Sequence, residues 1–572
     1  MAAIKDQRRA AEAAIFDQTN LLPPRKVVVI IGTLAMCQLI CFAEQTGIGI
    51  ALPAIGRDLN AQDTISWAGT SALIANTIFQ VLYGRLSDLF ERLEMINTYI
   101  TGRKPTLLWA LALLTISDLL CGFAQNDVML YVFRGFSGVA NGGVASLSAM
   151  IVSDVVTLEQ RGKWQGIIGA AVGIGNMTGP FIAAAFVQAG SWRGFFWSVS
   201  PAAVVCGCLC LWILPTSKGR PNMEFKQVMK QFDFGGIFFG SVALILLLIP
   251  IAGGGDYFEW DSPKVIVMLT IGGICFLLFI YVERSIALLP MMPLSLFKNT
   301  AVAVMLAQNF LFGIVAYSQT FYLPLFFQNA QRLSPLKAAC LMLPLTACQA
   351  CSSILSGQYI TRQRRYGEII WLGFFLWTLG SGLTCIFGVD TPIYAIVLIL
   401  VVNGIGIGMV FQPVLIAMQA HCTRAQRAIV ISNRNFIRSL GGAVGLAISA
   451  AALQNSLHKA MPKEFRDTTS AYETPNFDKL GEEDTAQIVQ AYATASRTIF
   501  YMNVPIIALC LIGCFLIKDR GLQRPDEVIV DEEKEVERSD SGTEQVVVVK
   551  PVEVTEKKKG ATDGRRMSGV TL

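Results

Sequence analysis

The sequence predicts an all-α integral membrane protein with fourteen membrane-spanning helices. Hydrophobic residues make up 53% of the 572 residues and charged residues only 15%, and the mean hydropathy is +0.52. The apolar residues fall in blocks close to the roughly 20 residues that a helix needs to cross a bilayer. Short loops that carry most of the charge separate these blocks.

The chain opens with a polar segment, 1–26, which lacks the apolar core of a cleaved signal peptide. Fourteen apolar blocks follow, and each is interpreted as one span. The predicted spans are 27–52, 67–86, 105–124, 128–152, 164–188, 193–214, 234–253, 264–282, 301–324, 336–358, 367–388, 391–414, 435–453 and 498–517.

Basic residues are concentrated in alternate loops. The loops after spans 2, 4, 6, 10 and 12 are rich in Lys and Arg, and the last of these is predicted to hold Arg424, Arg427 and Arg434. Basic loops stay on the cytoplasmic side of a membrane. The even number of spans then predicts that both termini face the cytoplasm.

Several function classes are disfavoured. Most of the 14 Cys lie inside apolar blocks and only two His occur, His421 and His458, so we expect no metal site and no disulfide framework. No phosphate-binding GxxxxGK[ST] loop and no nucleophile–base pair is found, which argues against ATP as the driving force and against an enzyme. The basic residues are scattered, so no nucleic-acid partner is expected, and no cofactor is predicted.

The stretch 166–185, GIIGAAVGIGNMTGPFIAAA, is rich in glycine. Interior glycines cost a soluble helix about 1 kcal/mol each and an interior proline about 3, whereas in a membrane small residues let helices approach closely. We expect a tightly packed, bendable helix. The spacing of Gly166, Gly175, Gly179 and Pro180 resembles the antiporter motif in the fifth helix of major facilitator superfamily exporters, with Ala183-Ala184 where that family has Gly-Gly.

A second motif follows span 2. Gly84 and Asp88, joined to Gly102, Arg103 and Lys104, resemble the superfamily signature Gly-x-Leu-x-Asp-x-x-Gly-Arg-Lys. The resemblance implies a gating latch in which Asp88 acts with Arg103.

Eleven residues, Glu91–Thr101, interrupt that signature. We hypothesise that they are an unspliced segment or an error in the gene prediction; a genuine insertion is the alternative. A transcript that encodes SDLFGRKP directly would support the hypothesis, and one that carries the insert would refute it.

Span 1 contains Glu44-Gln45-Thr46 and then Ala51-Leu52-Pro53. This is similar to the Asp-x-Thr…Ala-Leu-Pro motif of the fourteen-span drug:proton antiporters. A carboxylate inside a membrane is costly and faces a cavity or a partner. Glu44 is therefore a candidate for proton coupling or for binding a cationic substrate, and a local partner near the membrane surface is the alternative.

Span 4 carries Arg134 in RGFSGVANGG, which resembles the family's Arg-x-x-Gln-Gly motif with Ser137 in place of Gln. The resemblance links Arg134 to proton transfer. A buried guanidinium needs an acceptor, and Asp118 in span 3 is a candidate partner. A purely structural ion pair is the alternative.

Four amide side chains are candidates for a substrate cavity, with helix–helix hydrogen bonding as the alternative for each. They are Gln45, Asn309, Gln319 and Gln412.

The resemblance covers about 27–520 and implies the major facilitator fold, in which two six-helix bundles surround a cavity. The expected parts are a cytoplasmic N-terminal tail (1–26), a first bundle (27–214), a linker with two extra spans (215–300), a second bundle (301–517) with a long external loop (454–497), and a charged, disordered cytoplasmic tail (518–572).

The implied function is proton-coupled antiport that exports small organic molecules by alternating access, with spans 5 and 13 rocking. The motifs resemble those of fungal transporters, and drugs, toxins or secondary metabolites are the expected cargo. The plasma membrane is the expected location, with the vacuolar membrane as the alternative. A monomer is the expected state. The expected partners are the substrate, protons and the lipid bilayer. Transport of basic amino acids at the vacuole, transport of siderophores, and a transporter-like sensor that signals through its tail remain alternatives.

Overall fold

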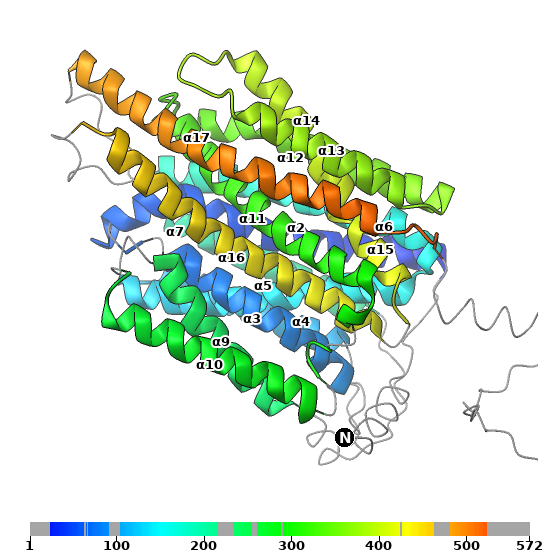
Figure 1. Ribbon diagram of the computed structural model, residues 1–572. Helices are drawn as coiled ribbons and strands as arrows, with labels where there is room; N and C mark the ends of the chain where they lie inside the picture. Colours follow the sequence, from blue (N-terminus) through cyan, green and yellow to red (C-terminus); the bar gives the residue numbers. More distant parts are fainter. Residues whose placement is uncertain are drawn as a thin grey trace, which may run out of the picture. The chain divides into compact units, whose positions relative to one another are not determined.

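The computed structural model describes ten stretches of the chain: 23–61, 64–65, 67–90, 103–214, 233–253, 260–287, 290–293, 296–423, 426–462 and 481–522. Within them the regular secondary structure is helical throughout, which confirms the predicted all-α class (Figure 1). The segment Glu91–Thr101 and Gly102 lie outside the described residues.

Fourteen long helices occupy the positions of the fourteen predicted spans in the described part of the chain. They are α2 (Pro24–Asp58), α3 (Trp67–Phe90), α4 (Arg103–Gly122), α5 (Asp127–Val155), α6 (Leu158–Gln188), α7 (Arg193–Ile213), α9 (Phe234–Gly253), α10 (Pro263–Ser285), α11 (Thr300–Asn329), α12 (Pro335–Gln363), α13 (Gly367–Thr384), α14 (Ile393–Phe411) with its continuation α15 (Pro413–Ala420), α16 (Arg427–Ala460) and α17 (Glu482–Gly513). Short 3-10 turns lie at Leu296–Lys298 (η1) and Cys514–Leu516 (η4). In the described part of the chain twelve of these helices are long and apolar enough to cross a membrane, with α14 and α15 counted together; α3 and α13 are not among them.

The helices pack as two groups of six. Helices α2 to α7 contact one another, as do α11 to α17. The groups meet chiefly along two helix pairs, α6 with α12 and α3 with α16, and α5 also contacts α16 while α6 contacts α15. The arrangement matches the expected pair of bundles, and it brings helices that are far apart in sequence to one interface.

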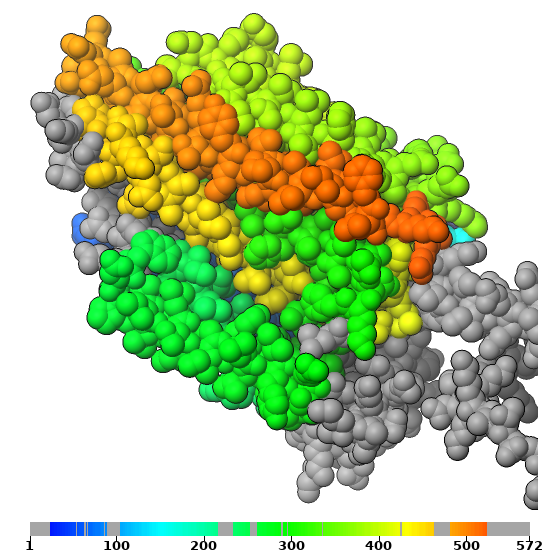
Figure 2. Space-filling view, in the orientation of Figure 1, coloured from blue at the N-terminus to red at the C-terminus, as the bar shows by residue number. Residues whose placement is uncertain are grey.

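Helices α9 and α10 form the extra pair. They pack on each other, and α9 also contacts α3 and α16. Leu248 of α9 is buried in an apolar cluster with Ile74 of α3 and Ala443 of α16. Figure 2 shows the pair in green beside the yellow α16. The pair therefore covers one seam between the two bundles.

Glycines explain how α6 approaches two neighbours at once. A Cβ atom on Gly179 would lie 2.1 Å from the backbone oxygen of Ala43 in α2, and one on Gly166 would lie 2.5 Å from the backbone oxygen of Ser353 in α12. No side chain fits at either contact. The helix includes Pro180 in its interior. The glycine-rich stretch is thus a packing surface with two sides, one toward its own bundle and one toward the other bundle.

Two helices are longer than the sequence predicts. Helix α16 begins at Arg427 rather than at 435, and α17 begins at Glu482 rather than at 498. The external loop predicted at 454–497 is correspondingly shorter, because α16 continues to Ala460. Charged residues at these helix ends predict loops, but the helices continue through them.

The segment after α17 is held in place by α13. Asp519 Oδ2 accepts hydrogen bonds from the backbone nitrogens of Tyr366 (3.2 Å) and Gly367 (2.9 Å) at the start of α13. The Tyr366 hydroxyl also lies 2.8 Å from His421 Nε2. The first residues of the predicted tail, from Lys518 to Leu522, are therefore placed against the second bundle.

Candidate functional site

A buried ion pair joins α2 to α5. The guanidinium of Arg134 forms a salt bridge with Glu44, and the two side chains are only 1% and 0% exposed. Asn141 Nδ2 donates to Glu44 Oε2 over 2.7 Å, and Arg134 Nε donates to the Ala68 carbonyl over 3.1 Å. The arrangement satisfies both charges with fixed donors and acceptors, as a buried pair requires.

The structure pairs Arg134 with Glu44 and not with Asp118, the partner considered from the sequence. Asp118 is fully buried in α4, and neither of its carboxyl oxygens has a hydrogen-bond partner among the described residues. An ionised carboxylate without partners is very costly in such a place. Asp118 therefore does not serve as the counter-charge of Arg134 in this structure.

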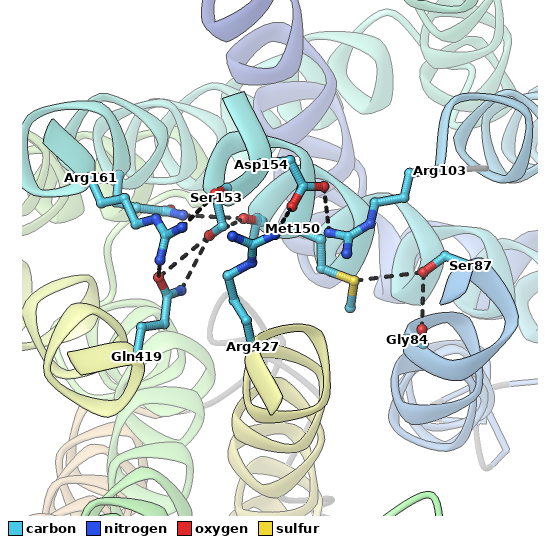
Figure 3. A network of polar contacts seen from close by, with 11 residues as sticks. Gly84, Ser87, Arg103, Met150, Ser153, Asp154, Arg161, Gln419 and Arg427 are labelled. Carbon is cyan, nitrogen blue, oxygen red and sulfur yellow. Dashed lines mark hydrogen bonds and ion pairs between the residues drawn. The ribbon is translucent and has the colours of Figure 1, made fainter. Parts of the chain in front are cut away.

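A second charged cluster crosses between the bundles (Figure 3). Asp154 of α5 lies between two guanidinium groups, with Oδ2 2.7 Å from Arg103 of α4 and Oδ1 2.5 Å from Arg427 of α16. The side chains of Arg103 and Asp154 are at most one-tenth exposed. One carboxylate thus links both bundles.

Arg161 of α6 extends the same cluster. It donates to Gln419 Oε1 of α15 over 2.9 Å and to the Ser153 carbonyl over 2.5 Å. Nearby, a Cβ atom on Gly84 of α3 would lie 2.5 Å from Ser432 Oγ of α16. The cluster therefore coincides with close contact between the bundles.

The structure describes only part of the predicted latch. Arg103 pairs with Asp154, and the side chain of Asp88 lies outside the described residues, as does Gly102. Lys104 Nζ donates to the carbonyls of Leu211 and Leu214 over 2.7 Å each, where α7 ends. Lys104 thus caps a helix C-terminus, where a cation is favourable.

A cavity lies between the two bundles. Its polar lining comes from α2, α6, the α14–α15 junction and α16, and Phe42 and Phe411 are among its apolar residues. The polar side chains that line it are Gln38, Gln165, Gln412, Arg434, Asn435 and Arg438.

Two arginines dominate this cavity. Arg434 and Arg438 are 3% and 5% exposed, and their guanidinium carbons lie 4.8 and 5.3 Å from the Phe411 ring centroid. Arg434 donates to Asn435 Oδ1 over 3.0 Å and to the Phe411 carbonyl. Among the described residues no carboxylate forms a salt bridge with either arginine. The cavity therefore carries two buried positive charges.

The four predicted cavity amides have different surroundings. Gln412 lines the cavity, and Gln45 is half-buried in α2. Gln319 accepts from Trp377 Nε1 and donates to Ser381 Oγ, over 3.1 Å each, inside the second bundle. Asn309 donates to the Met305 carbonyl one turn away, over 2.7 Å. Gln319 thus makes the hydrogen bonds between helices that are the alternative interpretation, whereas the Asn309 bond to Met305 stays within α11.

Sequence reasoning missed the arginine pair. The loop-charge pattern places Arg434 in a cytoplasmic loop, and no sequence motif points to Arg438. The structure corrects this because both lie on α16, four residues apart and so on one face of the helix. The sequence does contain a signal for this pair. Residues 427–460 contain no Asp or Glu, so the helix that carries the two arginines supplies no counter-charge for them.

The sequence profile of the Major Facilitator Superfamily matches residues 34–446. The chain belongs to the major facilitator superfamily. This facilitator therefore has the predicted fold and is a membrane transporter.

Named relatives agree with that family. The chain is 42% identical over 564 residues to "Citrate exporter 1" of Yarrowia lipolytica, covering 97% of this chain and 82% of the relative. It is 37% identical to "MFS-type transporter clz4" of Cochliobolus lunatus, covering 90% of each. It is 27% identical to "Multidrug resistance protein fnx1" of Schizosaccharomyces pombe, covering 83% of this chain and 89% of the relative.

A solved structure shares the fold. The human organic anion transporter MFSD10 (TETRAN) superposes with a TM-score of 0.54 at 15% identity, covering 87% of this chain and all of that one. At this identity the likeness shows the fold alone.

Proposed function

We propose that this facilitator exports a small organic anion with two or three carboxylate groups, in exchange for protons. The observation that carries the proposal is the pair of buried arginines, Arg434 and Arg438, in the cavity between the bundles. Two such charges are expensive to bury without a counter-charge. A carboxylate matches the fork of guanidinium donors and supplies that counter-charge.

The positive cavity disfavours two of the other substrates. Basic amino acids and cationic drugs would be repelled by Arg434 and Arg438, which have no described acidic partner. The name of the Yarrowia relative supports a carboxylate, and citrate is the test substrate it suggests. Neutral or anionic toxins remain a second candidate, because Phe42 and Phe411 also line the cavity and several relatives are named efflux pumps.

Proton coupling is proposed to pass through Glu44. Its carboxylate already accepts from Arg134 and Asn141, so protonation would release Arg134 and change the packing of α2 against α5. We propose the plasma membrane as the location and a monomer as the working unit. The salt bridge between Asp154 and Arg427, which joins the two bundles, would then break and reform as the cavity opens to each side in turn.

The test uses a yeast host that lacks its own exporter and is loaded with labelled citrate. We expect efflux that depends on this protein and falls at least tenfold when a protonophore is added. Arg438→Gln should abolish citrate efflux, whereas Arg193→Gln, in an exposed salt bridge with Asp58, should not. Citrate retention by cells with the wild-type protein at the surface would refute the proposal.

A further inference from the structure

We propose that Gln38 and Gln165 form a subsite that selects the hydroxyl group of a hydroxylated carboxylate. The proposal rests on the proposed function, because it concerns the same cavity, but it depends on different residues. Gln38 lies on α2 and Gln165 on α6, so both belong to the first bundle. Arg434 and Arg438 belong to the second bundle, and all four residues line the cavity.

Backbone chemistry fixes the orientation of both amides. Gln38 Nε2 donates to the Ala145 carbonyl over 3.3 Å, and Gln165 Nε2 donates to the Ala149 carbonyl over 3.4 Å. These two carbonyls lie four residues apart, one turn along α5. A carbonyl cannot donate, so turning either amide over would place two acceptors against each other. The side-chain nitrogens of Gln38 and Gln165 therefore remain hydrogen-bonded to the carbonyls of α5.

The two amide oxygens are consequently left as acceptors. Gln38 Oε1 and Gln165 Oε1 are buried and have no hydrogen-bond partner in the described part of the chain. The side chains themselves are 4% and 0% exposed. Buried acceptors in folded proteins nearly always have a donor. Gln412 Oε1, which also belongs to the cavity lining, is a third such acceptor. Unsatisfied acceptors around one cavity indicate that the ligand supplies a donor.

The cavity is thus polarised across the two bundles. Its second-bundle side offers guanidinium donors, which suit carboxylates. Its first-bundle side offers amide oxygens, which repel a carboxylate and accept from an O–H group. A ligand that suits both sides turns ionised carboxylates toward the arginines and a hydroxyl group toward Gln38 and Gln165, whose oxygens share or alternate in accepting its one hydrogen. A polycarboxylate without the hydroxyl would offer neither amide oxygen a donor, and such sites discriminate strongly against the analogue that lacks the donor.

The experiment compares citrate with tricarballylate, which has the same three carboxylates and no hydroxyl group. Both are loaded, with different labels, into the same cells, and the ratio of their efflux rates is measured. We expect the wild-type protein to export citrate at least tenfold faster. Gln38→Met with Gln165→Met keeps the side-chain length and removes both oxygens, and should bring the ratio to within about twofold of one. Each single variant should give an intermediate ratio.

Gln308→Met is the matched control. Gln308 is a buried amide of α11 whose nitrogen donates to the Cys510 carbonyl over 2.8 Å, and it does not line the cavity. Its variant should keep the wild-type ratio. Because the ratio compares two compounds in the same cells, a lower amount of protein does not alter it.

The possible failures are distinguishable. Equal export of both compounds by the wild-type protein would overturn the subsite and leave the proposed function standing. A double variant that still prefers citrate tenfold would do the same. Export of neither compound would overturn the proposed function together with the subsite.

Discussion

Asp154 Oδ1 of the first bundle lies 2.5 Å from an Arg427 nitrogen of the second bundle, while the other oxygen of the same carboxylate holds Arg103. We call this contact between the bundles the clamp, and its described acid is Asp154 on α5; the side chain of Asp88, the acid proposed from the sequence, lies outside the described residues. Because one carboxylate neutralises two guanidinium groups, its loss leaves two nearly buried charges without that partner.

Asp154→Asn is expected to loosen this clamp. Removing one partner of a buried ion pair costs roughly 3–5 kcal/mol, so we expect a clear fall in the melting temperature of the purified protein and at least tenfold slower transport. The control is Asp58→Asn. The Asp58 carboxylate accepts hydrogen bonds from Arg193 and Trp192, and these bonds, first that from Arg193, lower the pKa of Asp58. That pair is partly exposed and worth at most about 1 kcal/mol. Equal melting temperatures for the two variants would contradict the clamp.

Glu44→Gln is expected to uncouple transport from protons. The amide can still accept from Asn141, but it neither ionises nor neutralises Arg134. We expect the variant to exchange substrate across the membrane while losing the response to a pH gradient, as measured in proteoliposomes with and without that gradient.

Asp118→Asn provides the comparison for Glu44→Gln. Asp118 makes no hydrogen bond among the described residues, so its replacement should leave the pH response intact. A pH response that disappears in Asp118→Asn and survives in Glu44→Gln would reverse the assignment.

Acid is expected to release the segment after α17. Burial, and then the Arg520 cation, lower the pKa of His421 below its usual 6.5, against smaller opposing effects of Asp519 and the Lys518 backbone. The docked state then binds fewer protons than the released state. Docking is accordingly full above about pH 6.5 and weakens as the pH falls toward the lowered pKa. The neighbouring Tyr366 hydroxyl, whose pKa burial raises to about 12, stays neutral throughout.

Trypsin can measure this release, since Lys518 and Arg520 are cleavage sites in the segment. Cleavage there, corrected for the protease's own pH dependence, should be faster at pH 5.5 than at pH 7.5. His421→Gln should remove the difference, while His458→Gln, at an exposed position of α16, should retain it. A pH effect that survives in His421→Gln would point to another group.

Gly166→Ala is expected to impair transport. The added methyl group would lie 2.5 Å from the Ser353 carbonyl of α12, a backbone atom that cannot turn aside. Gly207→Ala in α7 is the control, because no atom lies within 4 Å of its Cβ position and alanine favours a helix by up to about 1 kcal/mol. We expect slower citrate efflux for the first variant only, at equal surface expression.

The sequence predicted the helices well because bilayer-length apolar blocks are a strong signal. It also identified Glu44 and Arg134 as intramembrane charges. Their pairing could not be predicted, since it depends on how α2 and α5 lie against each other, and Asp118 was an equally good candidate in the sequence.

Arg434 could not be recognised from the sequence as a charge inside a span. Charge is used to find loops, and a functional charge inside a span therefore looks like the end of that span. The span predicted at 435–453 begins just after Arg434 for this reason, so Arg434 is excluded from it while Arg438 lies inside it. The amide oxygens of Gln38 and Gln165 could not be predicted either, because their orientation depends on carbonyls of a different helix.

Gly162 of α6 and Gly357 of α12 oppose each other across the bundle interface, and a Cβ on either would lie within 2.6 Å of the other's backbone oxygen. Thr361 of α12 reaches across the same interface, where its Oγ1 accepts from the Lys163 backbone nitrogen over 2.8 Å. The two glycines themselves have no rotamer that must change when the bundles separate and meet again. We therefore expect this glycine pair to favour fast cycling rather than a strongly closed state.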